Sequence, residues 1–195
     1  TYHIASTFYI SHITDVQKKL FDAGIAHDIN FLKQQGDEVA QNQQLASEIL
    51  EGGHNGLVET LSREREFRGV GLMGVTDANG YVLGRTLTKG KYGDNVFLSL
   101  PIGRIVAQGK SAESIELNSF VGQISMVTAR PIIKDDKMIG ALFASYLLND
   151  AYARRFKEIY LRNGGEVVFY TKNNGIYGNS FANADERRLI ENYFN

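Results

Sequence analysis

The stretch Met126-Val-Thr-Ala-Arg-Pro-Ile-Ile-Lys-Asp-Asp-Lys-Met-Ile-Gly-Ala-Leu-Phe-Ala-Ser-Tyr146 carries the strongest structural signal in this sequence. Two apolar runs flank the polar turn Lys134-Asp-Asp-Lys137, a pattern that predicts a β-hairpin. An earlier stretch, Val70 to Thr86, has the same pattern and turns through Asp77-Ala-Asn-Gly80. Two hairpins behind a long helical pattern predict an α+β fold built on an antiparallel sheet.

The composition is that of a folded domain with no strong charge bias. The chain has 195 residues, of which 43% are hydrophobic and 22% charged, so it suits one domain or one domain with a fragment of another. Its 21 basic and 22 acidic residues give a net charge of −1, which argues against nucleic-acid binding. The absence of cysteine excludes disulfides and thiolate metal sites.

The sequence offers no membrane-spanning segment of its own. Its longest apolar run, Met138 to Leu148, is too short to cross a bilayer, and no signal-peptide pattern opens the chain. A helical pattern is already established at the first residues. We therefore expect the chain to be a piece of a longer protein whose membrane spans lie outside it.

The first quarter of the chain predicts one long helix. Apolar residues recur at helical spacing from about Ile4 to Leu50, and Gly52-Gly53 predicts its end. About 45 residues at roughly 1.5 Å each would form a rod of about 70 Å. We expect the excess length to pack on a partner or to stand exposed as a stalk. A shorter helix is predicted from Leu57 to Phe67.

The middle of the chain predicts the sheet. The first hairpin has strands at 71–76 and 81–86, and a loop at 88–95 leads to a helix at 101–108. Three further strands are predicted at 114–119, 122–129 and 137–146. The prediction is a five-stranded antiparallel sheet with flanking helices.

The last part of the chain predicts a helix-strand-helix addition. Asn149 or Asp150 would cap a helix that ends near Arg162, a strand would follow at 166–171, and a last helix would end at Phe194. We therefore divide the chain into a helical stalk with a second helix (1–65), a domain built on the sheet (66–148), and an addition or incomplete second module (149–195).

The usual catalytic and metal-binding motifs do not occur in the sequence. The four histidines lie in or beside the first predicted helix without zinc-ligand spacing, and the glycines do not form a phosphate-binding loop. Ser99, Ser125 and Ser145 lack the context of a nucleophile elbow. We predict no catalytic residues, no metal and no cofactor, and thus no enzyme.

Two arginines are the sharpest candidates for ligand contact. Arg85 ends the second predicted strand, and Arg130 precedes Pro131 at the predicted end of the fourth. Each interrupts an apolar alternation, and a guanidinium group suits a carboxylate. The alternatives are an internal ion pair, for instance with Asp77 or Asp94, or plain exposure. Further candidate pocket residues, whose tyrosines could equally be core edges, are Tyr92, Asp94, Met73, Tyr81, Ser125 and Tyr146.

Both hairpins resemble those of Cache domains, the extracytoplasmic PAS-like sensors of bacterial chemoreceptors and sensor kinases. The resemblance rests on Val75-Thr-Asp-Ala-Asn-Gly-Tyr-Val-Leu-Gly-Arg-Thr86 and on Pro131-Ile-Ile-Lys-Asp-Asp-Lys-Met-Ile-Gly140, and it covers residues 66–148. It implies a ligand pocket between the sheet and residues 88–109. In citrate-sensing relatives a basic residue at the position of Arg85 holds a carboxylate. A second family arginine is matched by Val127, a departure that argues against citrate itself.

The resemblance also implies a function. We expect the periplasmic or extracellular ligand-binding domain of a transmembrane receptor, in first place a methyl-accepting chemoreceptor. Its ligand would be a small organic acid or amino acid, the long helix would form a homodimer, and ligand binding would displace helices. Two alternatives stay open: the sensor of a histidine kinase or diguanylate cyclase, and a dimerisation module with no ligand.

Overall fold

The computed structural model describes residues 15–118, 122–162, 165–171 and 175–194. Its elements, in chain order, are α1 (Asp15–Ala40), α2 (Gln43–Glu51), α3 (His54–Arg68), β1 (Leu72–Asp77), β2 (Val82–Arg85), α4 (Val96–Ser99), α5 (Pro101–Val106), β3 (Ala112–Asn118), β4 (Gln123–Lys134), β5 (Lys137–Leu147), α6 (Asp150–Phe156), the π-helical turn η1 (Lys157–Leu161), β6 (Val168–Thr171), β7 (Gly175–Asn179) and α7 (Ala184–Phe194). The predicted α+β class, with a long helix before a five-stranded antiparallel sheet, is confirmed.

The sheet has the strand order β2-β1-β5-β4-β3, and every neighbouring pair is antiparallel. Both predicted hairpins are present. Asp135 and Asp136, with φ of 51° and 58°, form the two-residue turn between β4 and β5, and such left-handed pairs match the twist of the strands. In the first hairpin the Asp77 carboxylate accepts hydrogen bonds from the amides of Asn79 and Tyr81.

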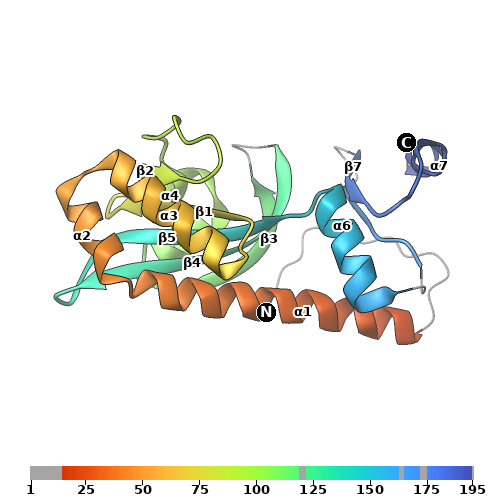
Figure 1. Ribbon diagram of the computed structural model, residues 1–195, viewed down its shortest axis with the longest axis horizontal. Helices are drawn as coiled ribbons and strands as arrows, with labels where there is room; N and C mark the ends of the chain where they lie inside the picture. The colour runs from red at the N-terminus through yellow and green to blue at the C-terminus, as the bar shows by residue number, and fades with distance from the viewer. Residues whose placement is uncertain (1–14, 119–121, 163–164, 172–174, 195) are drawn as a thin grey trace.

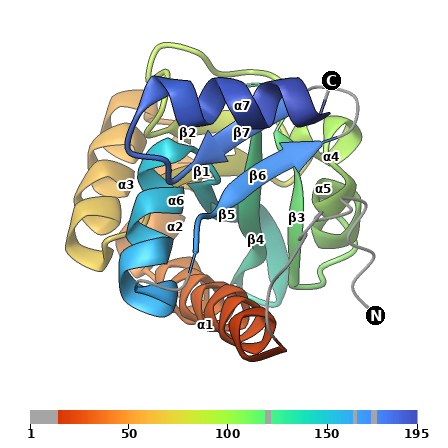
Figure 2. The ribbon, with the colours of Figure 1, turned by 90° about the vertical axis from the view of Figure 1, so that its right-hand side faces the viewer.

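The sheet lies between two layers of helices (Figure 2). On one face α1, α2 and α3 bury a large core that includes Leu32, Leu57, Val75 and Leu142. On the other face α4 and α5 cover a smaller core. Figure 1 shows α1 running along the length of the molecule, beneath the sheet and on to α6. This helix therefore contacts both the sheet and the C-terminal part of the chain.

The prediction of one continuous helix to Leu50 is wrong. The helix ends at Ala40 and a second helix begins at Gln43, while the predicted part before residue 15 lies outside the described residues. The break occurs because Asn42 adopts an extended conformation and its side chain accepts hydrogen bonds from the amides of Gln44 and Leu45, as an N-cap does. The described α1, with 26 residues, is about 39 Å long.

The strand that carries Arg130 is longer than predicted. We expected it to end at Ala129, but β4 continues through Arg130 and Pro131 to Lys134. The first residue of β3, Ala112, pairs with Ala129, so beyond that point β4 has a strand on one side only. A proline without an N–H is tolerated at such an edge. Arg130 thus lies within β4 and not at the end of that strand.

The C-terminal addition is a helix, a hairpin and a helix. The sequence predicted one strand here, but β6 pairs with β7, which we did not predict. Gly24 of α1 allows this helix to approach the C-terminal part closely, because a Cβ atom there would lie 2.7 Å from the Phe156 ring and 2.8 Å from the Tyr160 ring.

No helix in the described ranges has the length and apolar character needed to cross a membrane.

Candidate functional site

A small cavity lies between the sheet and the segment that follows β2. We call residues 86–100 the covering segment. The cavity has a volume of about 90 Å³, which is small beside the roughly 300–1,000 Å³ of pockets for drug-sized ligands. Its lining residues are Leu72, Met73, Gly74, Val75, Thr76, Val82, Arg85, Leu87, Thr88, Val96, Leu100, Asn118, Val127, Phe143 and Ser145. In this state the site suits a molecule of only a few non-hydrogen atoms.

Arg85 is the one ionisable side chain in the described lining of this mostly apolar cavity. It stands at the end of β2, opposite Gly74 of β1. The guanidinium group forms an ion pair with Asp94 of the covering segment, and the Arg85 side chain is only 14% exposed. Asp94 itself does not line the cavity. Its carboxylate pairs with the Arg85 guanidinium and so orients that side chain. A mostly desolvated guanidinium at the end of an apolar cavity suits a carboxylate.

Backbone hydrogen bonds fix the part of the covering segment that carries Asp94. The amide of Gly93 donates to Val82 O over 2.8 Å, and the amide of Val82 donates to Asp94 O over 2.9 Å. Asn95 then caps α4 by accepting from the amides of Phe97 and Leu98. Asp94 is thus held beside Val82, the first residue of β2, and its carboxylate pairs with Arg85 at the other end of the strand.

A second carboxyl group lies on the same face of the sheet, at the far edge. Glu116 of β3 is partly buried under α5, and the amide of Ile102 donates to its Oε2 over 3.4 Å. Burial raises the pKa of the Glu116 carboxyl, although this amide and the Ser114 hydroxyl favour the charged form. Oε1 of Glu116 has no hydrogen-bond partner among the described residues. Glu116 thus leaves one acceptor oxygen at the far edge without a partner among the described residues.

The structure brings together three of the eight sequence-predicted site residues. Arg85 and Met73 line the cavity, and Asp94 contacts Arg85. The Met73 side chain also belongs to the core on the opposite face, under the helices. The sequence reasoning missed the other lining residues, among them Thr88, Asn118 and Phe143. Alternation along β5 could have indicated Phe143, but no sequence pattern marked the other two.

The other five predicted residues lie elsewhere. Tyr81 is 49% exposed and Tyr92 61% exposed. Ser125 is buried but is not in the cavity lining. Tyr146 faces the other side of the sheet, where its hydroxyl donates to Gly69 O over 2.9 Å. The fifth residue, Arg130, has a different environment again.

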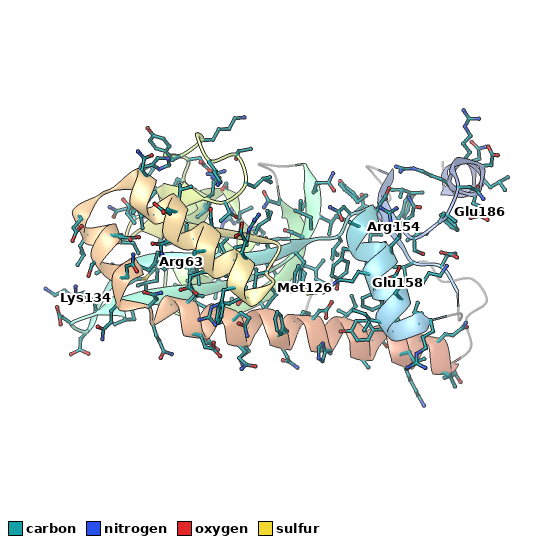
Figure 3. The ribbon with its side chains drawn as sticks, viewed as in Figure 1. Arg63, Met126, Lys134, Arg154, Glu158 and Glu186 are labelled. Atoms are coloured by element: carbon teal, nitrogen blue, oxygen red, sulfur yellow. The ribbon has the colours of Figure 1, made fainter. Side chains whose placement is uncertain are left out.

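Arg130 is the largest fully buried side chain of the described chain, on the face of the sheet opposite the cavity. It pairs with Asp37 of α1 and with Glu113 of β3. Its Nη1 also donates to Ala112 O and Ala129 O, over 3.1 and 2.9 Å. Met126, which is labelled in Figure 3, lies on the same face of β4, between the sheet and α1. Arg130 therefore fastens the long helix to the sheet and lies outside the cavity.

A second polar cluster fastens α1 to the C-terminal part. Asp28 is 5% exposed and accepts hydrogen bonds from the hydroxyls of Tyr152 and Tyr160, each over 2.7 Å. Arg155 pairs with the same carboxylate and stacks over the Tyr152 ring. Burial, with the adjacent carboxylate, raises the pKa of both tyrosines, so their hydroxyls stay protonated and donate.

Metal chemistry has no support in the described part of the chain. No group of three histidine, cysteine or acidic side chains there could hold a metal ion.

Several solved structures resemble this chain at low sequence identity. The sensor domain of the V. cholerae histidine kinase DctB matches 85% of this chain with a TM-score of 0.63 and 15% identity, and the chain spans 64% of that domain. The fold is that of bacterial periplasmic sensor domains. This confirms the fold that the resemblance to Cache domains implied.

Two further structures agree. The periplasmic domain of V. cholerae LuxQ matches 86% of this chain and 76% of its own length, with a TM-score of 0.55 and 18% identity. The ligand-binding domain of the Campylobacter jejuni chemoreceptor Tlp3, in complex with 4-methylisoleucine, matches 91% of this chain and 74% of its own length, with a TM-score of 0.52 and 14% identity. No protein-family model and no curated protein sequence matches the chain.

Proposed function

We propose that this chain is the extracytoplasmic ligand-binding sensor domain of a transmembrane receptor. Its ligand is a small carboxylate-bearing molecule, an organic acid or an amino acid. The observation that carries the proposal is Arg85, whose side chain is 14% exposed and stands in the wall of an otherwise mostly apolar cavity. A solved chemoreceptor domain of the same fold was crystallised with 4-methylisoleucine, a ligand of the proposed class.

The ligand carboxylate meets Arg85 and competes there with Asp94. Because Asp94 is 29% exposed and lies on the covering segment, a ligand that takes over part of the guanidinium group loosens the hold on that segment. The small volume of the cavity fits a state in which the internal carboxylate satisfies the arginine. A ligand larger than the present cavity enters by moving the covering segment outward.

The route from the cavity to α1 runs through β4. Val127 lines the cavity on one face of this strand, and Arg130, three residues further on, holds Asp37 of α1 on the other. At Gly36 the helix lies so close that an added Cβ would be 3.0 Å from Thr128 Cγ2. A shift of β4 on ligand binding is therefore passed directly to the helix.

The output of the receptor and its assembly are further parts of the proposal. A chemoreceptor, a histidine kinase or a diguanylate cyclase could use the same sensor; solved domains of this fold include the sensor domain of a histidine kinase and that of a chemoreceptor. We expect a homodimer through α1, whose Val16 and Leu20 are 65% and 44% exposed. A dimerisation module with an empty cavity is the competing function, and the small cavity volume is the observation in its favour.

Calorimetry of the purified domain with a set of organic acids and amino acids tests the proposal. We expect at least one carboxylate compound to bind, and Arg85→Ala to weaken its binding about 10- to 100-fold, the range expected for a lost hydrogen bond to a charged group. Arg104→Ala is the matched control, since Arg104 is an exposed arginine of α5 outside the cavity. No binding by any carboxylate, or equal affinity in Arg85→Ala and the wild type, contradicts the proposal.

A further inference from the structure

His54, the first residue of α3, lies where three elements meet. Its Nδ1 is 2.6 Å from Leu83 O in β2, and its Nε2 is 3.1 Å from Lys89 O in the covering segment. The Tyr92 ring stacks against the imidazole with a centroid distance of 4.2 Å. The side chain thus joins α3 to the covering segment that closes the proposed binding cavity.

Both neighbours of the ring nitrogens are acceptors. A carbonyl oxygen accepts hydrogen bonds and cannot donate them. A neutral imidazole has one N–H and one lone pair, so it satisfies one of the two carbonyls and turns its lone pair toward the other. An imidazolium has two N–H groups and donates to both. Both ring nitrogens of His54 can therefore donate hydrogen bonds to their carbonyl neighbours only when the ring is doubly protonated.

The charged groups around His54 give no simpler explanation of this geometry. Glu51 ends α2, and Lys89 and Lys91 belong to the covering segment, but no ion pair of the described residues includes His54. The N-terminus of α3 disfavours a positive charge on the ring, whereas the Tyr92 ring favours it. The two carbonyl contacts remain as the specific interactions that select the protonated ring.

The turn that the ring holds is strained. Thr88, which lines the cavity, has φ of 54°, a conformation that β-branched residues rarely adopt. Its carbonyl accepts a hydrogen bond from the amide of Lys91 over 2.8 Å, which closes the turn around Lys89. Such strain persists only where the surroundings hold it, and the contact of His54 with Lys89 O is one of the contacts that do so.

We propose that His54 is a proton-dependent latch on the covering segment, an inference that rests on the proposed function of the cavity beneath it. Protonated His54 ties Lys89 O to α3 and keeps the segment closed. When the ring loses one proton, Nδ1 still donates to Leu83 O over the shorter distance, and the hydrogen bond from Nε2 to Lys89 O is lost. Since the bond to Lys89 O needs the second proton, the segment opens more often as the pH rises and the ring loses that proton.

Amide hydrogen exchange tests the latch without a ligand, so its result is independent of whether the cavity binds a carboxylate. The reporters are the amide of Lys91, bonded to Thr88 O, and the amide of Gly93, bonded to Val82 O. After correction for the intrinsic pH dependence of exchange, we expect about tenfold less protection of the Lys91 amide at about pH 8 than at about pH 5. Gly93, held on β2 itself, should change much less.

Two variants and one spectrum make the test decisive. His54→Asn keeps a donor close to Leu83 O but cannot titrate, so the Lys91 amide should show low protection at both pH values. His27→Asn removes the exposed histidine of α1 and should keep the wild-type pH dependence. The ring ¹⁵N shifts of wild-type His54 should report an imidazolium at about pH 5. A neutral ring there, or equal Lys91 protection across the range, overturns the latch.

Discussion

Replacing Arg130 by methionine should destabilise the fold strongly, because Arg130 is the buried cation that joins the sheet to α1. Methionine keeps much of the apolar stem but removes the charge, which leaves the carboxylates of Asp37 and Glu113 without their partner. Removal of one member of a buried ion pair typically costs about 3–5 kcal/mol. Since Asp37 is 44% exposed and Glu113 20% exposed, both can regain water. We therefore expect the lower end, about 3 kcal/mol.

Urea unfolding followed by circular dichroism measures this free energy. For a chain of this length the loss corresponds to a fall in Tm of about 6–12 °C. The exposed Arg104→Met is the matched control and should stay within about 0.5 kcal/mol of the wild type. Adding Asp37→Asn and Glu113→Gln to Arg130→Met should recover part of the loss, because the stranded charges are then removed. If Arg130→Met loses no more stability than the control, the ion pairs do not hold α1 to the sheet.

Three further predictions concern stability. Gly24→Ala should cost about 1–3 kcal/mol, because its Cβ would overlap the Phe156 and Tyr160 rings. Gly56→Ala, at an exposed position of α3 where the added Cβ would make only an ordinary contact of 3.8 Å with Glu48, should instead stabilise by about 0.5–1 kcal/mol. Equal effects of the two changes in thermal unfolding would refute the close approach at Gly24. Tyr152→Phe should cost about 1.5–3 kcal/mol by removing a hydrogen bond to the buried Asp28 carboxylate; unchanged stability would show that Asp28 does not need this donor. The folded-state pKa of Glu116 is raised above 4.5, so its contribution is fully present below pH 4.5 and is lost as the pH rises through the folded-state pKa. Glu116→Gln should therefore raise the free energy of unfolding at pH 7 relative to the wild type, with no such gain at pH 4, and a gain of the same size at both pH values would contradict the assignment.

The antiparallel sheet was predictable because its signals are local. The two turns are marked by aspartate, asparagine and glycine residues, and the flanking apolar runs have the length of strands. Arg85 was identifiable as a charged residue at the end of a short apolar strand. Its pairing with Asp94 was one of the alternatives that the sequence allowed, and the structure shows that pair.

Other features depend on contacts between distant residues, which a single sequence does not reveal. The break at Asn42 is visible only once its side chain is known to cap α2. The sequence alone did not show that Arg130 faces the helices, because an arginine next to a proline reads as the end of a strand. Tyr92 and Thr88 lie in the same short loop, yet only Thr88 lines the cavity. That difference is set by the fold of the covering segment.

The cavity beneath the covering segment is the proposed binding site for a small carboxylate molecule. The most direct measurement is a methyl NMR titration of the labelled domain with the compound that calorimetry selects. We predict shifts at the cavity methyl groups of Val82, Val96, Leu100 and Val127, with these shifts lost in Arg85→Ala and kept in Arg104→Ala. Shifts confined to methyl groups outside this cavity, or the same cavity shifts in Arg85→Ala, would contradict the claim.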